Sequence, residues 1–312
     1  MAVHTVLEEN EIKRILSLYD VGHLIEYKGI TQGIENTNYF LKTSREKYIL
    51  TIFEKRVNNR DLPFYLDLMD HIKSQGINCP RSLLSKQKKK IQSIKKKKLA
   101  IFTFIHGKCL KNWNKDICYS VGKELAKLHQ LSTNFHKERN NDFSINKWVS
   151  IFEKLKKKVG NFFPETDSII SKELNFLKEN WLKNLPKGII HADLFPDNIL
   201  FKNNKISGII DFYFSCTDFF VYDLAITINA WCFNKNKFQH SFFSSLVNGY
   251  QSERKLTEHE KKKLNISLRG AAIRFLLTRL LDFYKEEKNL IKKDPLDFLN
   301  ILSFHARNDL KC

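Results

Sequence analysis

Three polar residues near the middle of the chain have the types and spacing that phosphoryl transfer requires. Asp193 and Asn198 stand five residues apart, and Asp211 follows Asn198 by thirteen residues. Apolar runs flank both segments, so the sequence predicts a polar loop between short strands, with Asp211 delivered by the neighbouring strand. One carboxylate can then accept the proton of an attacking hydroxyl while an amide and a second carboxylate hold a divalent cation. Phosphoryl transfer to an alcohol uses this set of groups.

Each of these residues alone has a plainer interpretation, because Asp and Asn are common in turns and bond to the turn backbone. The full pattern favours chemistry over a structural loop: His-x-Asp-x-x-x-x-Asn lies between apolar runs and is followed by Ile-Ile-Asp. Within it we expect His191 to support the loop by hydrogen bonds. We interpret Asp197 as a turn residue rather than a ligand.

Two packed lobes are expected to position this loop, because 312 residues is about twice the usual length of a domain. The first lobe, residues 1–105, begins with an amphipathic helix after the capping pattern Thr5 to Glu8. β-rich pieces from Leu24 to Phe53, a helix from Asp61 to Gly76 and an inner strand from Leu99 to Ile105 follow. These elements predict a small antiparallel sheet with one helix packed on it.

The second lobe, residues 106–312, is predicted to be mainly helical. Apolar residues recur at helical spacing on several stripes, among them Ile117 to Leu128 and Trp148 to Leu155. A short β-rich island from Gly188 to Phe214 interrupts these helices and contains the polar loop. The expected fold class is therefore α+β, with a small sheet lobe and a larger helical lobe.

Composition limits the partners that the chain could have. With 42% hydrophobic and 28% charged residues and only 6 Pro and 11 Gly, the chain is globular. A net charge of +19 raises the question of nucleic acid. Much of the excess is in lysine runs that lack the arginines and interleaved aromatic residues that read or stack on bases. We interpret these lysines as solvated surface, with an acidic partner as the alternative.

No feature of the sequence indicates secretion or a membrane span. The six cysteines form no CxxC pair, so neither a zinc site nor a redox pair is indicated. The first ten residues contain no apolar signal region. The most apolar stretch, Ile209 to Phe233, holds three Asp, which a bilayer would strongly disfavour. We expect a cytoplasmic protein with reduced thiols and neither a membrane nor a nucleic-acid partner.

The loop from His191 to Asn198 and the strand ending at Asp211 resemble the protein-kinase-like small-molecule kinases, the group of aminoglycoside phosphotransferases and choline kinases. Longer stretches are similar to the bacterial homoserine kinases of that superfamily, as is the opening Met-Ala-Val-x-Thr. The resemblance runs nearly from end to end, through residues 62–66, 190–199, 208–218, 222–226, 230–233 and 269–279.

This resemblance implies a two-lobe kinase-like fold and the ATP- and Mg²⁺-dependent phosphorylation of L-homoserine to O-phospho-L-homoserine. Transferred residue by residue, it makes Asp193 the base toward the substrate hydroxyl, and Asn198 and Asp211 the Mg²⁺ ligands. Asp223 matches a family acid that braces the catalytic loop. Its apolar neighbours independently require that an ionised side chain there be paired or hydrogen-bonded.

The nucleotide-binding residues are expected in the first lobe. The segment from Gly29 to Asn38, with Gly33, Asn36 and Asn38, is the candidate phosphate-covering loop, although the glycine pattern alone would also fit an ordinary hairpin turn. Thr51 stands where the superfamily usually has a lysine, so Lys42 and Lys55 are the candidate substitutes and Asp70 the candidate paired acid. The backbone of Thr103, Phe104 and Ile105 is expected to meet adenine.

A zwitterionic amino-acid substrate needs a cation for its carboxylate and an acid for its ammonium group. The candidates are Arg274 and Arg279 on one apolar helix, with Tyr213 and Asp218 beyond Asp211. An internal pair with Asp282 would equally explain one of the arginines. Because positions five apart differ by about 140° around a helix, we expect at most one of the two to reach the substrate. His129 is interpreted as a packing histidine.

Two other functions fit the sequence less well. The nearest is another hydroxyl kinase of the superfamily, acting on choline, an aminoglycoside or a sugar. A choline site would require an aromatic cage, and an aminoglycoside site a strongly acidic surface. The second is an inactive binding module or a basic nucleic-acid adaptor, which the complete set of Asp193, Asn198 and Asp211 opposes.

Overall fold

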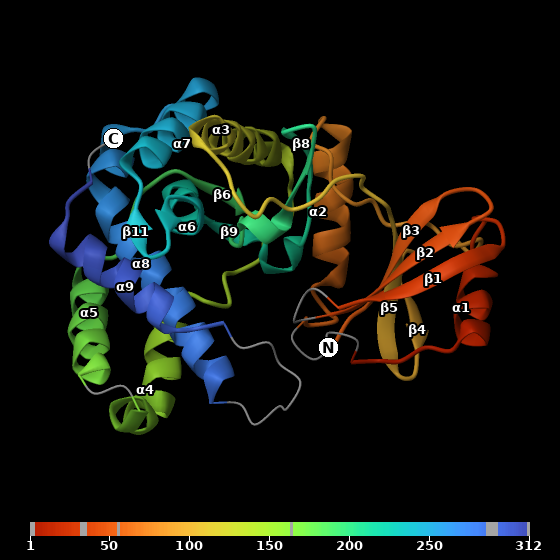
Figure 1. The fold of residues 1–312 in the computed structure, drawn as a ribbon, viewed down its shortest axis with the longest axis horizontal. Coiled ribbons are helices and arrows are strands. Elements are labelled where there is room, and N and C mark those ends of the chain that lie inside the picture. Colours follow the sequence, from red (N-terminus) through yellow and green to blue (C-terminus); the bar gives the residue numbers. More distant parts are fainter. Residues whose placement is uncertain (1–3, 32–35, 55–56, 163–164, 285–292, 311–312) are drawn as a thin grey trace. The chain divides into compact units, whose positions relative to one another are not determined.

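The structure is a computed structural model that describes residues 4–31, 36–54, 57–162, 165–284 and 293–310. It has the expected α+β fold, with an antiparallel sheet in the N-terminal part and mainly helices after it (Figure 1). The described residues form two compact units. Unit 1 holds those of Met1–Gly107 and Gly208–Tyr213, and unit 2 holds those of Lys108–Ser207, Phe214–Glu286 and Lys292–Cys312. A short segment from the middle of the chain, which carries Asp211, thus belongs to unit 1.

Unit 1 is a five-stranded antiparallel sheet with two helices. The strands lie in the order β1-β2-β3-β5-β4. Their bounds are β1 Leu24–Ile30, β2 Thr37–Thr43, β3 Lys47–Ile52, β4 Gln92–Ile94 and β5 Lys97–Thr103, and the helices are α1 Glu9–Leu16 and α2 Leu62–Ser74. The register places Thr51 opposite Asn38 on one side and Ala100 on the other.

Helix α1 covers one face of this sheet. Its Ile12, Ile15 and Leu16 join a buried core with Leu50 and Ile52 of β3. Since successive residues of a strand point to opposite faces, Thr51 lies on the other face. The expected capping pattern from Thr5 was wrong. The helix begins at Glu9, and the Thr5 hydroxyl instead donates to Glu54 at 2.6 Å.

Unit 2 is built from seven described helices and short two-stranded sheets. The helices are α3 Lys115–Leu131, α4 Ile145–Phe162, α5 Thr166–Asn180, α6 Phe220–Trp231, α7 His240–Glu253, α8 Glu258–Phe283 and α9 Leu296–Arg307. β6 Lys187–Ile190 pairs with β9 Cys216–Phe219, and β10 Phe233–Asn234 with β11 Lys237–Phe238. β7 Ile199–Lys202 and β8 Lys205–Ile209 form the hairpin that leads from Asn198 toward Asp211.

Close packing of α3 against α7 explains two glycines. A Cβ atom on Gly122 would lie 2.0 Å from the carbonyl oxygen of Leu246, and one on Gly249 would lie 2.0 Å from that of Tyr119. Only glycine allows the two backbones to approach so closely. Within the described part of the chain, no helix is both long and apolar enough to cross a membrane.

Candidate active site

The polar loop lies between β6 and a short 3₁₀ turn, Pro196–Asn198. It brings together two of the predicted residues. The amide nitrogen of Asn198 donates to the carboxylate of Asp193 at 3.0 Å and to the carbonyl of the same residue at 2.8 Å. Both hydrogen bonds use Nδ2, so Oδ1 of Asn198 is the atom that remains to bind a cation. Asp193 is partly exposed, which leaves it accessible to a substrate.

Buried Asp223 of α6 braces the loop from behind. Its carboxylate accepts the main-chain N–H groups of His191 and Ala192, both at 2.8 Å, and Nε2 of His129 at 3.0 Å. Burial alone would raise the pKa of Asp223, but the hydrogen bonds from His129 and from the main chain of His191 hold this pKa below its usual value.

His129 extends the brace toward α7 and α8. Burial lowers the pKa of its ring despite the opposing effect of Asp223, so the ring is neutral near pH 7. Nε2–H then donates to Asp223, and the Tyr250 hydroxyl donates to Nδ1 at 2.8 Å. Arg254 donates to Tyr250 at 3.1 Å and to Glu260 at 2.8 Å. The histidine that the sequence assigned to packing thus belongs to a buried chain of hydrogen bonds that ends at the loop.

Other side chains hold the remaining loop residues. Trp231 donates to the Leu194 carbonyl at 2.9 Å. The Phe195 ring contacts Phe275, with centroids 4.8 Å apart. Exposed Asp197 forms an ion pair with Lys293 at 3.1 Å. The loop is therefore fixed at nearly every position between its two strands.

Asp211 follows β8 with a left-handed backbone, φ 66°. Two residues on, Tyr213 packs edge-on against Phe53 and Tyr65, with centroids 5.4 and 5.7 Å apart. Burial raises the pKa of Tyr213, and a hydrogen bond with Thr51 opposes that shift. Tyr213 therefore contributes to the packing of unit 1, and its assignment to the substrate stays a prediction.

Of the predicted nucleotide residues, Asn36, Asn38 and Thr51 lie toward the end of the sheet where β2 begins. Thr51, in the usual lysine position, donates to Asn38 at 2.7 Å. Asn36 accepts the main-chain N–H of Glu54 at 3.2 Å. Gly33 and Lys55 lie outside the described residues. At the opposite end of the sheet, where β5 ends, the Thr103 hydroxyl accepts a hydrogen bond from the main-chain N–H of Arg81 at 3.0 Å. Phe104 and Ile105 come directly after this strand.

Among the described residues, Asp70 forms ion pairs with Lys90 and Arg81, and not with the suggested Lys42. Its carboxylate contacts Lys90 at 2.7 Å and Arg81 at 3.5 Å, and Lys90 also contacts Asp67 at 2.6 Å. Lys42 is exposed on β2. Sequence reasoning missed Lys90 because it stands among surface lysines, twenty residues from Asp70, and no local pattern marks it.

Sequence reasoning also missed a polar cluster at the start of β2. The partly buried carboxylate of Glu54 accepts hydrogen bonds from the hydroxyls of Thr5 and Thr37 at 2.6 and 2.8 Å and forms an ion pair with Lys97. Thr37 also accepts the main-chain N–H of Thr5 at 3.1 Å. This cluster anchors the N-terminal segment to the strand that follows the candidate phosphate loop.

The two candidate arginines have different internal partners. Arg274 is 2% exposed and donates to the Ala192 carbonyl. Arg279 uses Nη1 for Asp297 at 2.9 Å and the Asp294 carbonyl at 2.6 Å, so Asp297, not Asp282, is its acid. Burial lowers the pKa of Arg279, and its bond to Asp297 opposes that shift.

The candidate acid Asp218 lies on β9. Its carboxylate accepts hydrogen bonds from Nδ2 of Asn141 at 2.7 Å and from the main-chain N–H of Phe219 at 2.8 Å. Burial raises the pKa of Asp218 despite these bonds and the nearby charge of Arg274.

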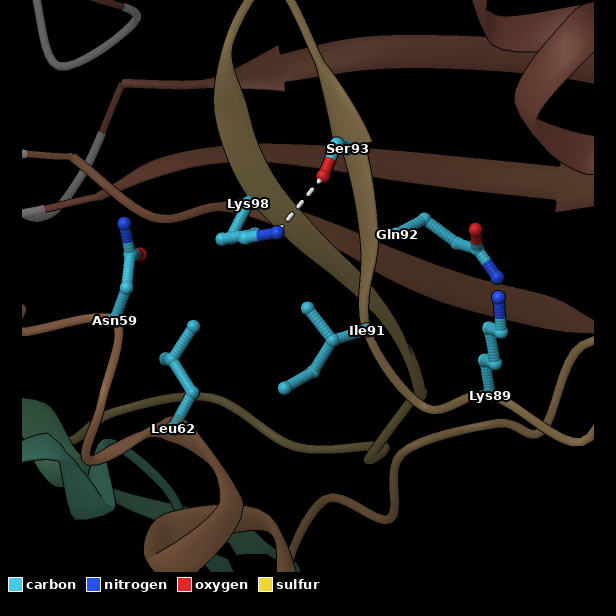
Figure 2. Close-up of a pocket in the computed structure, with 7 residues that line it drawn as sticks. All are labelled: Asn59, Leu62, Lys89, Ile91, Gln92, Ser93 and Lys98. Atoms are coloured by element: carbon cyan, nitrogen blue, oxygen red, sulfur yellow. Dashed lines mark hydrogen bonds between the residues drawn. The ribbon is translucent and has the colours of Figure 1, made fainter.

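A pocket of about 540 Å³ opens in unit 1, where residues near the start of α2 face the β4–β5 hairpin (Figure 2). Lys98 donates to Ser93 there at 3.2 Å. None of the predicted site residues lines it, and it contains no carboxylate. Its lining residues are Asn59, Leu62, Lys89, Ile91, Gln92, Ser93 and Lys98.

The fold and the loop together define a phosphotransferase, and comparison with known families agrees. The model of the family described as "Phosphotransferase enzyme family" matches residues 26–256, and the chain belongs to that family. Among its relatives are the homoserine kinases of Sinorhizobium medicae, 42% identical over 308 residues, and Rhizobium etli, 42% identical over 310 residues. Both alignments cover 98% of this chain, and they cover 94% and 97% of the respective relatives.

Solved structures of small-molecule kinases share the fold. Amicoumacin kinase hAmiN, in complex with AMP-PNP and Ca²⁺, superposes with a TM-score of 0.71 at 17% identity, over 96% of this chain and 92% of that one. A microcompartment-associated aminopropanol kinase superposes with a TM-score of 0.70 at 15% identity, over 96% of this chain and 97% of the other.

Proposed function

We propose that this protein is a homoserine kinase that transfers the γ-phosphoryl group of ATP to the side-chain hydroxyl of L-homoserine. The product is O-phospho-L-homoserine, and the reaction is a step of threonine biosynthesis. The observation that carries the substrate assignment is the similarity to homoserine kinases at about 42% identity over 98% of the chain. We place the reaction in the cytoplasm, with ATP and homoserine as its small-molecule partners.

Asp193 is assigned as the general base. Its carboxylate is partly exposed, and Asn198 donates to one of its oxygens at 3.0 Å, which orients the carboxylate to accept the hydroxyl proton. The brace of Asp223 and His129 keeps the loop in one conformation. The attacking hydroxyl therefore meets a base that is already in place, so little reorganisation accompanies the transfer.

Asn198 and Asp211 are assigned as ligands of Mg²⁺. Amide and carboxylate oxygens are the donors that Mg²⁺ prefers, and Oδ1 of Asn198 is left for a cation, so these residues fit the ion. Mg²⁺ is usually held by one or two protein side chains together with substrate phosphates, so two protein ligands are enough. When bound, Mg²⁺ would neutralise charge on the phosphates.

The remaining assignments follow the same proposal. The segment with Gly33, Asn36 and Asn38 covers the phosphates, and the main chain of Thr103 to Ile105 meets adenine. Asp218 takes the substrate ammonium group, because burial disfavours its charge even with Arg274 nearby, so a further cation beside it would be favourable. Arg279 takes the substrate carboxylate through Nε and Nη2, since its internal bonds both use Nη1.

An ADP-release assay over homoserine, serine, threonine, choline and kanamycin tests the substrate assignment. We expect the highest kcat/KM with homoserine and no appreciable turnover with choline or kanamycin. A preference for choline or kanamycin would replace the assignment with another kinase of the same family.

A further inference from the structure

Arg274 is buried without the partner that a buried cation usually has. Its side chain is 2% exposed, yet within the described part of the chain no carboxylate forms an ion pair with it. Its guanidinium instead lies against three aromatic rings, with 5.4 Å to the centroid of Phe143, 5.5 Å to Phe214 and 4.5 Å to Phe275. Asp218 and the hydroxyl of Tyr222 also interact with Arg274. Burying a charge is nonetheless costly, so its hydrogen bond to the main chain needs a reason.

That contact is the main-chain carbonyl of Ala192, which accepts Nη1 of Arg274. Ala192 directly precedes Asp193 and has a left-handed backbone, φ 63°. A residue with a Cβ atom adopts this conformation at a cost, so surrounding contacts must hold it there.

Both polar main-chain groups of Ala192 are held by side chains. Asp223 of α6 accepts its N–H at 2.8 Å, and Arg274 of α8 donates to its carbonyl. Fixing these two groups fixes the two backbone torsions of Ala192. Those torsions set the direction in which the chain enters Asp193, and hence where the carboxylate of Asp193 points.

We propose that Arg274 is a positioning residue of the phosphotransfer reaction, which aims Asp193 by holding Ala192 in its left-handed conformation, and that it does not bind the substrate carboxylate. The inference rests on the proposed function in taking Asp193 as the base. It assigns Arg274 to the turnover step rather than to substrate binding.

Arg269 offers a matched control on the same helix. It is also an arginine with a partly buried side chain, it lies 3.8 Å from the ring centroid of Phe176, and it binds Glu173 at 2.6 and 2.8 Å. It contacts no residue of the catalytic loop among the described residues. Arg269→Met should therefore lower stability without changing the rate per folded molecule.

The test compares Arg274→Met, Arg274→Lys and Arg269→Met for kcat and KM, with kcat corrected for the folded fraction. A misplaced base costs on the order of 10²-fold in rate. We expect Arg274→Met to lose about 10²-fold in kcat with both KM values within about threefold of wild type. Arg274→Lys, which keeps a charged donor, should recover at least part of that loss. Arg269→Met should keep the wild-type kcat.

A rise in homoserine KM of tenfold or more in Arg274→Met, with kcat retained, would overturn the proposal, because it would place Arg274 on the substrate. An equal loss of kcat in Arg269→Met would overturn it as well. Hydrogen exchange of the peptide that spans residues 189–196 gives a readout that does not depend on which substrate accepts the phosphoryl group. It should be faster in Arg274→Met and unchanged in Arg269→Met, and unchanged exchange in both would contradict the proposal.

If the wild-type enzyme does not phosphorylate homoserine, the proposed function fails. The kinetic comparison then uses the acceptor that the enzyme does phosphorylate, and the exchange measurement stands as it is.

Discussion

Replacing Asp223 by Asn tests the brace behind the catalytic loop. The carboxylate accepts three hydrogen bonds: Oδ2 from the N–H of His191 and from Nε2 of His129, and Oδ1 from the N–H of Ala192. An amide of nearly the same size has only one acceptor oxygen. With that oxygen in the Oδ2 position it keeps two bonds, while its NH₂ group faces the N–H of Ala192.

The expected loss of stability follows from this count. A hydrogen bond to a charged group contributes about 1.5–3 kcal/mol, so losing the Ala192 bond costs about that much. The two remaining bonds lose the charge of their acceptor, and a buried donor is left facing another donor. Together these effects predict that Asp223→Asn lowers the free energy of unfolding by about 3–5 kcal/mol, a large part of the stability of a typical domain.

Urea unfolding followed by circular dichroism measures this change, with Thr227→Val as the control. Thr227 is buried on the same helix, but among the described residues its hydroxyl bonds only to the carbonyl of Asp223, at 2.9 Å, so its loss should cost about 1 kcal/mol. In the folded fraction, Asp223→Asn should also lower kcat, because the bond that fixes Ala192 is gone. If Asp223→Asn is no less stable than Thr227→Val, the reasoning about the brace is refuted.

Three further predictions concern stability and ligands. Burial, with the charge of Arg269 nearby, lowers the pKa of His305 to about 3. Because the unfolded histidine binds a proton from about pH 6.5 downward, the free energy of unfolding should fall by about 2 kcal/mol between pH 7 and pH 5. Denaturant titrations of His305→Gln at the two pH values should lack this loss. Asp211→Ala should abolish Mg²⁺-dependent ATP binding in calorimetry, and an unchanged affinity in folded protein would exclude the metal role. Arg279→Met should raise the KM for homoserine by about 30- to 150-fold, equivalent to about 2–3 kcal/mol, and leave the KM for ATP unchanged. An unchanged KM for homoserine would mean that the substrate carboxylate binds elsewhere.

The fold and the loop could be predicted from the sequence because their signals are local. Runs of β-branched and aromatic residues bounded by turn residues define strands such as β3, and helical spacing defines α3 and α4. The pairing of Asp193 with Asn198 spans only five residues, so the loop pattern already contains it.

What the sequence could not supply were contacts between distant residues. The Ala192 carbonyl meets Arg274 from eighty-two residues away, and Asp223 meets His129 from ninety-four. Thr5 looked like the start of a capping pattern, but Glu54, forty-nine residues on, accepts its hydroxyl instead. Only tertiary packing decides which partner such a side chain binds, because its donor or acceptor could bind a neighbour in the sequence or a distant residue equally well.

The most direct test of the central claim is turnover of homoserine by the wild-type enzyme and by Asp193→Asn, measured as ADP release, with ATP affinity measured by calorimetry. We predict that the wild-type enzyme phosphorylates homoserine and that Asp193→Asn loses about 10²- to 10⁴-fold in kcat, because it can no longer accept the hydroxyl proton, while ATP affinity is nearly unchanged. A wild-type kcat in folded Asp193→Asn would contradict the assignment of the catalytic base.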